Sequence, residues 1–228
     1  MIENFRNIAR QYDLLNTIIS FGQHWRWKRR LVAKALELCG NPPTKPVLDI
    51  STGTGDVAAR FVSVRNGHAF SVVGLDPCRE MMAVGRAKYG GRFLWTEGFS
   101  EELPFRDRSV SIISCAFGVR NFGDLARAFR EWKRVLVPGG IAAVLETHPT
   151  PPVWYRPAIL LYWNHVMPRI GQLFSRKAAY EYLRDSTLHF LNPARMIDVA
   201  RSAGLRHVHS ESLMVRGMVS LTFFRNDD

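Results

Sequence analysis

Apolar and polar positions alternate along most of the chain in blocks that predict strands and helices in turn. Short apolar runs predict strands at residues 47–50, 70–75, 92–95, 110–116 and 141–146, with helical patterns between them at 57–62, 81–88 and 124–136. Further on, the pattern predicts a helix at 193–203 and a closing hairpin of strands at 205–213 and 218–224. Strands that alternate with helices, separated by breakers such as Pro138-Gly139-Gly140, indicate a doubly wound α/β fold with right-handed crossovers. We therefore expect a mostly parallel seven-stranded sheet with a C-terminal antiparallel hairpin.

Two segments do not follow this alternation. Residues 1–40 carry a helical pattern with a break around residues 16–22, and we expect them to form an N-terminal helical cap. Residues 150–190 are rich in aromatic side chains and prolines, so we expect a helical lid over the carboxyl edge of the sheet. A chain of 228 residues fits a single domain of this architecture, which would span residues 1–228.

A glycine turn follows the first predicted strand and marks the expected ligand site. Gly53 and Gly55 are spaced as Gly-x-Gly between that strand and the next helix. Glycines let the backbone approach a ligand closely, and the free N–H groups of the helix start face that ligand. With Ala58, the same pattern also fits the fingerprint of dinucleotide-binding proteins. The turn alone therefore leaves two classes of nucleotide-like ligand open.

Asp49 bears on the choice between these ligands, because it lies at the carboxyl end of the first strand. A carboxylate aimed at the turn would repel a pyrophosphate and attract a ligand that carries an ammonium and a sulfonium group. S-adenosylmethionine (SAM) is such a ligand, so the pattern favours SAM over a dinucleotide. Two alternatives stay open: an Asp that only caps the next turn, and a nicotinamide-dependent oxidoreductase.

Further polar positions follow the ends of the next strands, where open α/β sheets bind their ligands. Asp76 lies 21 positions beyond Gly55, the spacing expected of an acid that accepts hydrogen bonds from ribose hydroxyls. Residues 97–102 would hold an adenine, and residues 117–121 would face the transferred group. Arg120 lies in this last segment and is either a functional cation or a surface charge.

The net charge raises the question of an anionic partner. The chain has a formal net charge of +11 and a pI near 10.1, which suits nucleic acid or a membrane surface. No nucleic-acid-binding module accompanies the charge, so we expect no nucleic-acid partner. A basic stretch from Arg26 to Lys34 is either a solvated helix face or a surface for anionic lipid headgroups. Peripheral association with a membrane is therefore an open option, as is a homo-oligomer.

Cysteine usage and hydropathy predict a cytoplasmic protein. Cys39, Cys78 and Cys115 lack the spacing of a disulfide framework or a zinc site, so no metal is expected. The N-terminus has no apolar signal core, and the apolar run at residues 158–163 is too short to span a bilayer. We expect a soluble chain that at most associates with the inner face of the membrane.

Several segments, taken together, carry a resemblance to a known family. They are Tyr12-Asp13-Leu14-Leu15-Asn16, Ser20-Phe21-Gly22 with His24 and Trp27, Asp49-Ile50-Ser51-Thr52-Gly53-Thr54-Gly55-Asp56, Gly74-Leu75-Asp76, Leu103-Pro104-Phe105, Ala116-Phe117-Gly118-Val119-Arg120-Asn121 and Arg134-Val135-Leu136-Val137-Pro138-Gly139-Gly140. The chain resembles the ubiquinone/menaquinone biosynthesis C-methyltransferase family (UbiE-type) from about Phe5 to Phe224. The glycine pattern is shared by many SAM enzymes, whereas the Tyr-Asp-x-x-Asn and Phe-Gly-x-Arg-Asn segments are far more specific.

The resemblance implies a Rossmann-like, class I SAM-methyltransferase fold with a SAM pocket. The residues that would bind SAM are Asp49, Ser51, Gly53, Thr54, Gly55, Asp76, Pro77, Phe99, Ser100 and Ala116, and those that would face the substrate are Tyr12, Asn16 and Phe117. The family usually has Asp or Asn, followed by Ala, where this chain has Phe99 and Ser100. Backbone N–H groups, Glu97 or stacking on Phe99 would replace the usual adenine contact. His148 likewise stands where the family has Ser.

The implied reaction is methylation of a ring carbon of a prenylated hydroquinone, either demethylmenaquinol or a demethoxy-type ubiquinol precursor. The carbon becomes nucleophilic as its neighbouring hydroxyl loses a proton, so the site must align the reactants and exclude water. Arg120 is the candidate for stabilising the developing phenolate, and Asn121 for orienting the substrate. A guanidinium, with a pKa above about 12, does not act as a base. Water, His24 or His148 would accept the proton.

Two further hypotheses stay open beside the quinol methyltransferase and the oxidoreductase. One is a SAM methyltransferase that acts on another small aromatic compound or lipid. The other is a noncatalytic relative that binds SAM or a partner, which the departure at Phe99 suggests.

Overall fold

The fold is organised around one twisted sheet. The computed structural model describes residues 6, 9, 12–65, 70–149, 157, 161, 184–214 and 218–228. The sheet is seven-stranded, with the order β3-β2-β1-β4-β5-β7-β6. The strands are β1 (Val47–Ile50), β2 (Val72–Asp76), β3 (Leu94–Glu97), β4 (Val110–Ala116), β5 (Leu136–Thr147), β6 (Arg206–Met214) and β7 (Val219–Arg225). Strands β1 to β5 pair in parallel, and β7 pairs antiparallel with β5 and β6. The predicted mostly parallel sheet with an antiparallel C-terminal pair is confirmed.

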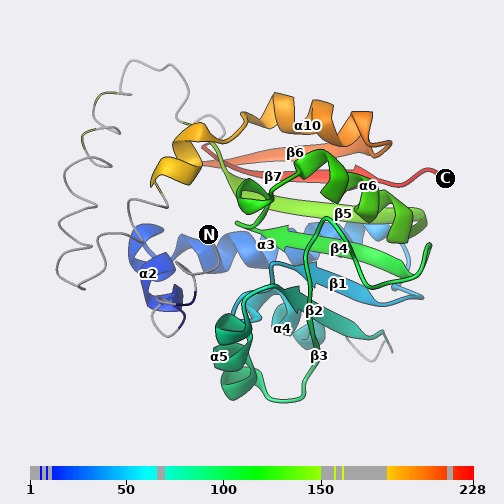
Figure 1. The fold of residues 1–228 in the computed structure, drawn as a ribbon, viewed down its shortest axis with the longest axis horizontal. Coiled ribbons are helices and arrows are strands. Elements are labelled where there is room, and N and C mark those ends of the chain that lie inside the picture. The colour runs from blue at the N-terminus through cyan, green and yellow to red at the C-terminus, as the bar shows by residue number, and fades with distance from the viewer. Residues whose placement is uncertain are drawn as a thin grey trace.

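Helices cover both faces of this sheet (Figure 1). The described helices are α2 (Tyr12–Ile19), α3 (Gln23–Cys39), α4 (Asp56–Ser63), α5 (Arg79–Tyr89), α6 (Leu125–Val135) and α10 (Pro193–Ser202). Leu31 of α3 and Phe61 of α4 lie in one core with Val47, whereas Trp132 of α6 lies in a second core with Leu48. Successive residues of a strand point to opposite faces, so β1 supplies side chains to both cores.

The carboxyl ends of the parallel strands meet at one edge of the sheet. Strands β1, β2 and β4 are buried along almost their whole length, as expected for parallel strands covered on both faces. Their pairing brings Ile50 opposite Leu75 and opposite Cys115. The segments that follow these three strands therefore lie side by side, and they carry the residues of the candidate site.

The predicted turn at Pro138-Gly139-Gly140 is corrected by the structure. These residues lie inside β5, which begins at Leu136. Val110 of β4 pairs with Leu136, and Ile112 pairs with Ile141, so the extra residues of β5 bulge out of the ladder. Gly139 adopts φ 78°, a left-handed conformation that favours glycine. The breaker residues therefore produce a bulge within the strand instead of a turn before it.

Other boundaries also differ from the predictions, by one to a few residues. The N-terminal break was expected around residues 16–22, but α2 continues to Ile19 and only residues 20–22 separate it from α3. Phe21 and Gly22 both have positive φ, 49° and 73°, which sets the change of direction. The third strand was expected at 92–95 and is found two residues later, because its ladder with β2 pairs Val73 with Leu94.

The predicted lid at residues 150–190 falls mostly outside the described residues. Of that segment the structure describes 157, 161 and 184–190, and residues 184–189 are helical. In the part of the chain that is described, no helix is both long and apolar enough to cross a bilayer. The lid and the single-domain organisation therefore stay predictions.

Candidate active site

A cavity opens at the carboxyl edge of the sheet, where the segments after β1, β2, β3 and β4 converge. Its lining residues are Tyr12, Ser51, Gly53, Leu75, Asp76, Pro77, Cys78, Met81, Gly98, Phe99, Ser100, Glu101, Ala116, Phe117, Gly118, Asn121 and Phe122. We call this the main cavity. A second cavity adjoins the glycine turn and is lined by Tyr12, Lys28, Asp49, Ser51, Thr52, Gly53, Thr54, Asp56, Val57, Ala116 and Phe117. Because the two cavities share five lining residues, we treat them as parts of one site.

The glycine turn has the close approaches that require glycine. Gly55 has φ 85°, and a Cβ there would lie 2.6 Å from Trp95 and 2.7 Å from Phe93. Gly53 has φ 56°, and a Cβ there would lie 3.2 Å from the Met81 Cε atom. Side chains at these positions would clash with β3 or crowd α5, so both glycines are needed for the turn to lie against them.

The loops after β1 and β4 press against each other in a strained backbone. Ser51 has φ 52° and Phe117 has φ 60°, a left-handed conformation that is uncommon for residues other than glycine. A Cβ on Gly118 would lie 2.6 Å from the Ser51 Cβ. Such strain is maintained only where the surrounding structure imposes it, and it concentrates at ligand sites. All three residues line the main cavity.

The carboxylate of Asp49 is occupied by groups of the protein itself. One oxygen accepts a hydrogen bond from Ser114 Oγ at 2.6 Å, and the other accepts from Thr52 Oγ1 at 2.6 Å and from the Ala58 N–H at 3.2 Å. Burial raises the pKa of Asp49 to about 6 in spite of these bonds. Since Ala58 belongs to α4, Asp49 does cap the next helix. It also lines the second cavity, so a contribution to ligand electrostatics stays compatible with this geometry.

Asp76 ties the end of β2 to the glycine turn. One oxygen accepts from the Gly53 N–H and the other from the Cys78 N–H, both at 2.8 Å. Burial raises the pKa of Asp76 to about 6. Each carboxylate oxygen has a second lone pair, which leaves acceptor capacity toward the main cavity for ribose hydroxyls.

The predicted adenine side combines one exposed and one buried residue. Phe99 is 52% exposed and lines the main cavity, so its ring is available for stacking. Ser100 is buried, and its hydroxyl accepts a hydrogen bond from the Trp132 indole N–H at 2.8 Å. Glu97 is paired with Arg79 at 2.5 Å on the surface and does not line this cavity. Phe99, unlike Glu97, lies at the cavity, so stacking on its ring and contacts from backbone N–H groups both stay predictions for the adenine contact.

Arg120 lies next to the main cavity but is not among its lining residues. Its guanidinium forms an ion pair with Glu146, and its backbone N–H donates to the same carboxylate at 3.2 Å. Both side chains are buried, while the Arg120 Nε atom has no hydrogen-bond partner in the part of the chain that the structure describes. The positive charge of Arg120 is therefore balanced inside the protein, and one of its donors is unused.

The two candidate histidines differ in how many of their ring nitrogens form hydrogen bonds. The Nδ1 atom of His148 lies 2.9 Å from the Leu191 carbonyl, so Nδ1 carries the proton and Nε2 accepts from Ser220 Oγ at 2.9 Å. His24 Nε2 lies 3.0 Å from Thr17 Oγ1, and its buried Nδ1 atom has no hydrogen-bond partner among the residues that are described. Burial lowers the pKa of both, that of His24 to about 4.

Of the predicted substrate and cofactor residues, most meet at the site. Tyr12, Ser51, Gly53, Ala116 and Phe117 line both cavities, Pro77 and Asn121 line the main one, and Thr54 lines the second. Asn16, Gly55, His24, Arg120 and His148 line neither. No group of three or more His, Cys, Asp or Glu side chains that could hold a metal is found among the described residues.

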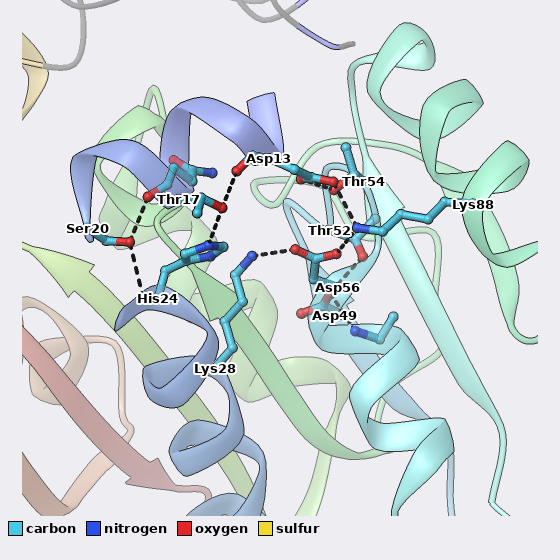
Figure 2. A network of polar contacts seen from close by, with 12 residues as sticks. Asp13, Thr17, Ser20, His24, Lys28, Asp49, Thr52, Thr54, Asp56 and Lys88 are labelled. Carbon is cyan, nitrogen blue, oxygen red and sulfur yellow. Dashed lines mark hydrogen bonds and ion pairs between the residues drawn. The ribbon is translucent and has the colours of Figure 1, made fainter. Parts of the chain in front are cut away.

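Sequence reasoning missed a network of charges beside the glycine turn (Figure 2). Its members are Asp13, Lys28, Asp56 and Lys88, which come from α2, α3, α4 and α5. Asp13 and Asp56 were quoted only as parts of longer segments. Their partners are distant in the sequence, and no spacing rule links them. The available signal was the position of Asp56 directly after Gly55, at the start of a helix.

Comparison with solved structures identifies the fold. A SAM-dependent methyltransferase of Thermotoga maritima matches with a TM-score of 0.65 and 16% identity over 98% of each chain. At this identity the likeness shows the fold alone. The sequence model of the ubiE/COQ5 methyltransferase family matches residues 1–223. The chain belongs to this family.

Relatives within the family are similar over nearly their whole length. A demethylmenaquinone methyltransferase of Deinococcus radiodurans is 39% identical over 90% of this chain and 84% of its own. A ubiquinone/menaquinone biosynthesis C-methyltransferase UbiE of Geotalea daltonii is 35% identical over 92% of this chain and 90% of its own. The protein is thus an enzyme, a SAM-dependent methyltransferase, and the oxidoreductase alternative finds no support.

The site residues of this family member fit SAM. Gly53 exposes backbone to the cavities, Asp76 offers free lone pairs, and Asp49 adds negative charge near the turn. Phe99 supplies an aromatic face at the same cavity. When bound, SAM supplies an electrophilic methyl group. These residues would bind and orient it by the contacts that a nucleoside with a cationic amino-acid tail requires.

Proposed function

We propose that this enzyme methylates a ring carbon of a prenylated hydroquinone in quinone biosynthesis. The observation that carries the proposal is the similarity to relatives named demethylmenaquinone methyltransferase and UbiE over 84% and 90% of their lengths. In the balanced reaction the bond from sulfur to the methyl group breaks and a methyl–carbon bond forms. The ring carbon then loses its proton, and S-adenosylhomocysteine is the second product.

The cavity walls support an aromatic acceptor. Tyr12 and Phe117 line both cavities, so an aromatic ring between them would lie beside the cofactor turn. The Asn121 side chain lies at the same wall, where we propose that its amide orients the hydroxyls of the acceptor. Packing of this kind aligns the reactants and excludes water.

Arg120 is proposed to stabilise the developing phenolate from within its ion pair with Glu146. Its Nε–H is buried and has no acceptor among the described residues, so it can donate to an oxygen without breaking the pair. His148 is an unsuitable base, because both of its ring nitrogens are engaged. His24 is a weak base with a pKa near 4. We therefore propose that water accepts the proton.

The decisive experiment is a transfer assay with labelled SAM in detergent. Demethylmenaquinol and a demethoxy-type ubiquinol precursor are offered separately, and label in the ring methyl group is measured. Label in either quinol supports the proposal and identifies the ring class. Normal S-adenosylhomocysteine binding without label in either quinol would contradict it and favour another aromatic or lipid acceptor.

We also propose that the enzyme meets its long-tailed acceptor at a membrane surface. Exposed Phe21 and Trp25 lie beside exposed Arg26 and Arg29 at the start of α3. The basic stretch is partly neutralised, because Arg30 pairs with Glu211 and Lys34 with Glu37. Arg26 and Arg29 have no ion-pair partner among the described residues, and apolar rings next to such arginines suit an anionic lipid surface.

Liposome flotation tests this second proposal. Wild-type protein should float with anionic vesicles, and R26E/R29E should lose most of that association. R195E/R201E makes the same charge change on exposed residues of α10 and should keep it. Equal loss in both variants, or no flotation of wild type, would contradict a specific membrane surface on α3.

A further inference from the structure

Helix α2 lies over the candidate site and contributes Tyr12 to it. Tyr12 lines both the main and the second cavity, so it lies at their junction. The described side chains of α2 are all half-buried or exposed, in contrast to α3, where Leu31, Val32 and Ala35 are fully buried. Burial in the central core therefore anchors α3 more firmly than α2, whose Tyr12 packs against a small cluster of Ala9, Cys78 and Met81. Polar contacts next to Tyr12 add to this packing.

Asp13, the next residue, supplies such contacts (Figure 2). One carboxylate oxygen accepts a hydrogen bond from Thr54 Oγ1 at 2.7 Å, and the other accepts from Lys88 Nζ at 2.8 Å. Thr54 belongs to the glycine turn and Lys88 to α5. A single side chain therefore joins α2 to two elements that border the cofactor site.

Lys88 is itself held in place by a second carboxylate. Its Nζ atom donates to Asp56 at 2.6 Å, and Asp56 also accepts from Lys28 Nζ at 2.7 Å and from Tyr89 Oη at 2.9 Å. Asp56 and Lys28 are buried, with side chains 3% and 10% exposed. Asp13 and Lys88 are more accessible, with side chains 28% and 33% exposed. The hydrogen bonds of Asp13 are thus the contacts of the network that can break most readily.

The connection between α2 and α3 allows such an opening. Phe21 and Gly22 both adopt left-handed backbone conformations, and a Cβ on Gly22 would meet nothing within 4 Å. Phe21 is 76% exposed and is not held in the core. A short connection between a helix buried in the core and a helix at its edge is a suitable hinge, and the contact between Thr17 Oγ1 and His24 Nε2 at 3.0 Å keeps the two helices together there.

We propose that Asp13 is a positioning residue that holds Tyr12 and α2 closed over bound cofactor through Thr54 and Lys88. Cofactor exchange then requires these two hydrogen bonds to break. The proposal rests on the SAM-binding part of the proposed function and not on the identity of the acceptor. It predicts that weakening the Asp13 contacts accelerates cofactor release more than it lowers global stability.

The test measures the dissociation rate of S-adenosylhomocysteine by stopped-flow displacement with excess SAM, together with thermal unfolding. Asp13→Asn and Lys88→Met should each raise this rate about tenfold, equivalent to about 1.4 kcal/mol. Thr54→Val removes the hydroxyl at nearly constant shape and should raise the rate severalfold. Thr54→Ser keeps the hydroxyl and should raise the rate less than Thr54→Val does.

A control separates positioning from a loss of stability. Asp227→Asn breaks the surface pair between Arg206 and Asp227, and it should leave the dissociation rate unchanged. Rates within twofold of wild type in D13N and T54V, a rate in T54S as high as that in T54V, or an increase in D227N equal to that in D13N would overturn the proposal. Failure of the quinol assay would leave this test intact, because it needs only cofactor binding.

Discussion

The guanidinium of Arg120 and the carboxylate of Glu146 form an ion pair whose side chains are 5% and 0% exposed. The pair joins the segment after β4 to the end of β5, and Glu146 also accepts from the Thr147 N–H at 2.7 Å. The loop that supplies Phe117 and Asn121 to the cavity is therefore fixed by a buried charge pair. The pair therefore helps to fix the geometry on the proposed acceptor side.

Removing the charge of Glu146 should destabilise the protein. Glu146→Gln leaves a buried guanidinium without its counter-ion, and we expect the free energy of unfolding to fall by about 3 kcal/mol. Denaturant titration measures the change. Asp107→Asn breaks the exposed contact between Asp107 and Arg134 and should cost less than about 1 kcal/mol. Similar losses in the two variants would contradict the importance of the buried pair.

Substitution of Arg120 should affect turnover more than cofactor binding. We expect Arg120→Ala to lower the rate of quinol methylation by at least about 100-fold, as found for lost oxyanion donors. The dissociation constant for S-adenosylhomocysteine should stay within about threefold of wild type. Arg120→Lys keeps the positive charge but loses the planar guanidinium, so its methylation rate should lie between those of wild type and R120A. Normal turnover in R120A with SAM bound would exclude the proposed role.

Cofactor affinity should depend on pH through Asp49 and Asp76. Burial raises the pKa of each to about 6, so both carry a proton below that pH in the free enzyme. The cationic amino-acid tail and the ribose hydroxyls of the cofactor both favour the ionised form of these carboxyl groups. Cofactor binding should therefore release protons, and cofactor affinity should weaken as the pH falls through 6. Calorimetry between about pH 5 and 7.5 measures this. Affinity independent of pH over that range would contradict it.

Phe99 should contribute to cofactor affinity by stacking. Its ring is half-exposed at the main cavity, and Phe99→Ala should weaken S-adenosylhomocysteine binding about threefold to tenfold through loss of about 1 kcal/mol of aromatic contact. Phe99→Asp restores the acid that the family usually has here and should recover part of that loss. Fluorescence titration compares the three proteins. Unchanged affinity in F99A would assign the adenine contact to backbone groups.

Gly22 should be needed for the connection between α2 and α3. Its φ of 73° is unfavourable for residues with a Cβ, although free space surrounds it. Gly22→Ala should therefore lower stability by about 1 kcal/mol through backbone strain alone. Gly91→Ala, at an open position without positive φ, is the matched control and should be neutral. Equal unfolding midpoints for both variants would argue against strain at this connection.

The sequence by itself determined the order and type of most elements and the place of the glycine turn. Local patterns carry that information: apolar runs mark β1, β2 and β4, and Gly53, Gly55 and Asp76 lie at fixed spacings along the chain. Strand pairing then moved β3 by two residues and placed Gly139 inside β5. Those shifts depend on partners that a local pattern does not contain.

Only the tertiary structure decided which side chains meet. It paired Arg120 with Glu146, engaged both nitrogens of His148, and joined Asp13 to Thr54 and Lys88. Arg120 and Glu146 are 26 positions apart in the sequence, and Asp13 and Lys88 are 75 positions apart. Hydrogen bonds and ion pairs act over a few ångströms, so they depend on how the helices and strands pack. The sequence therefore predicts a cofactor turn, whereas packing determines which charges remain free to act there.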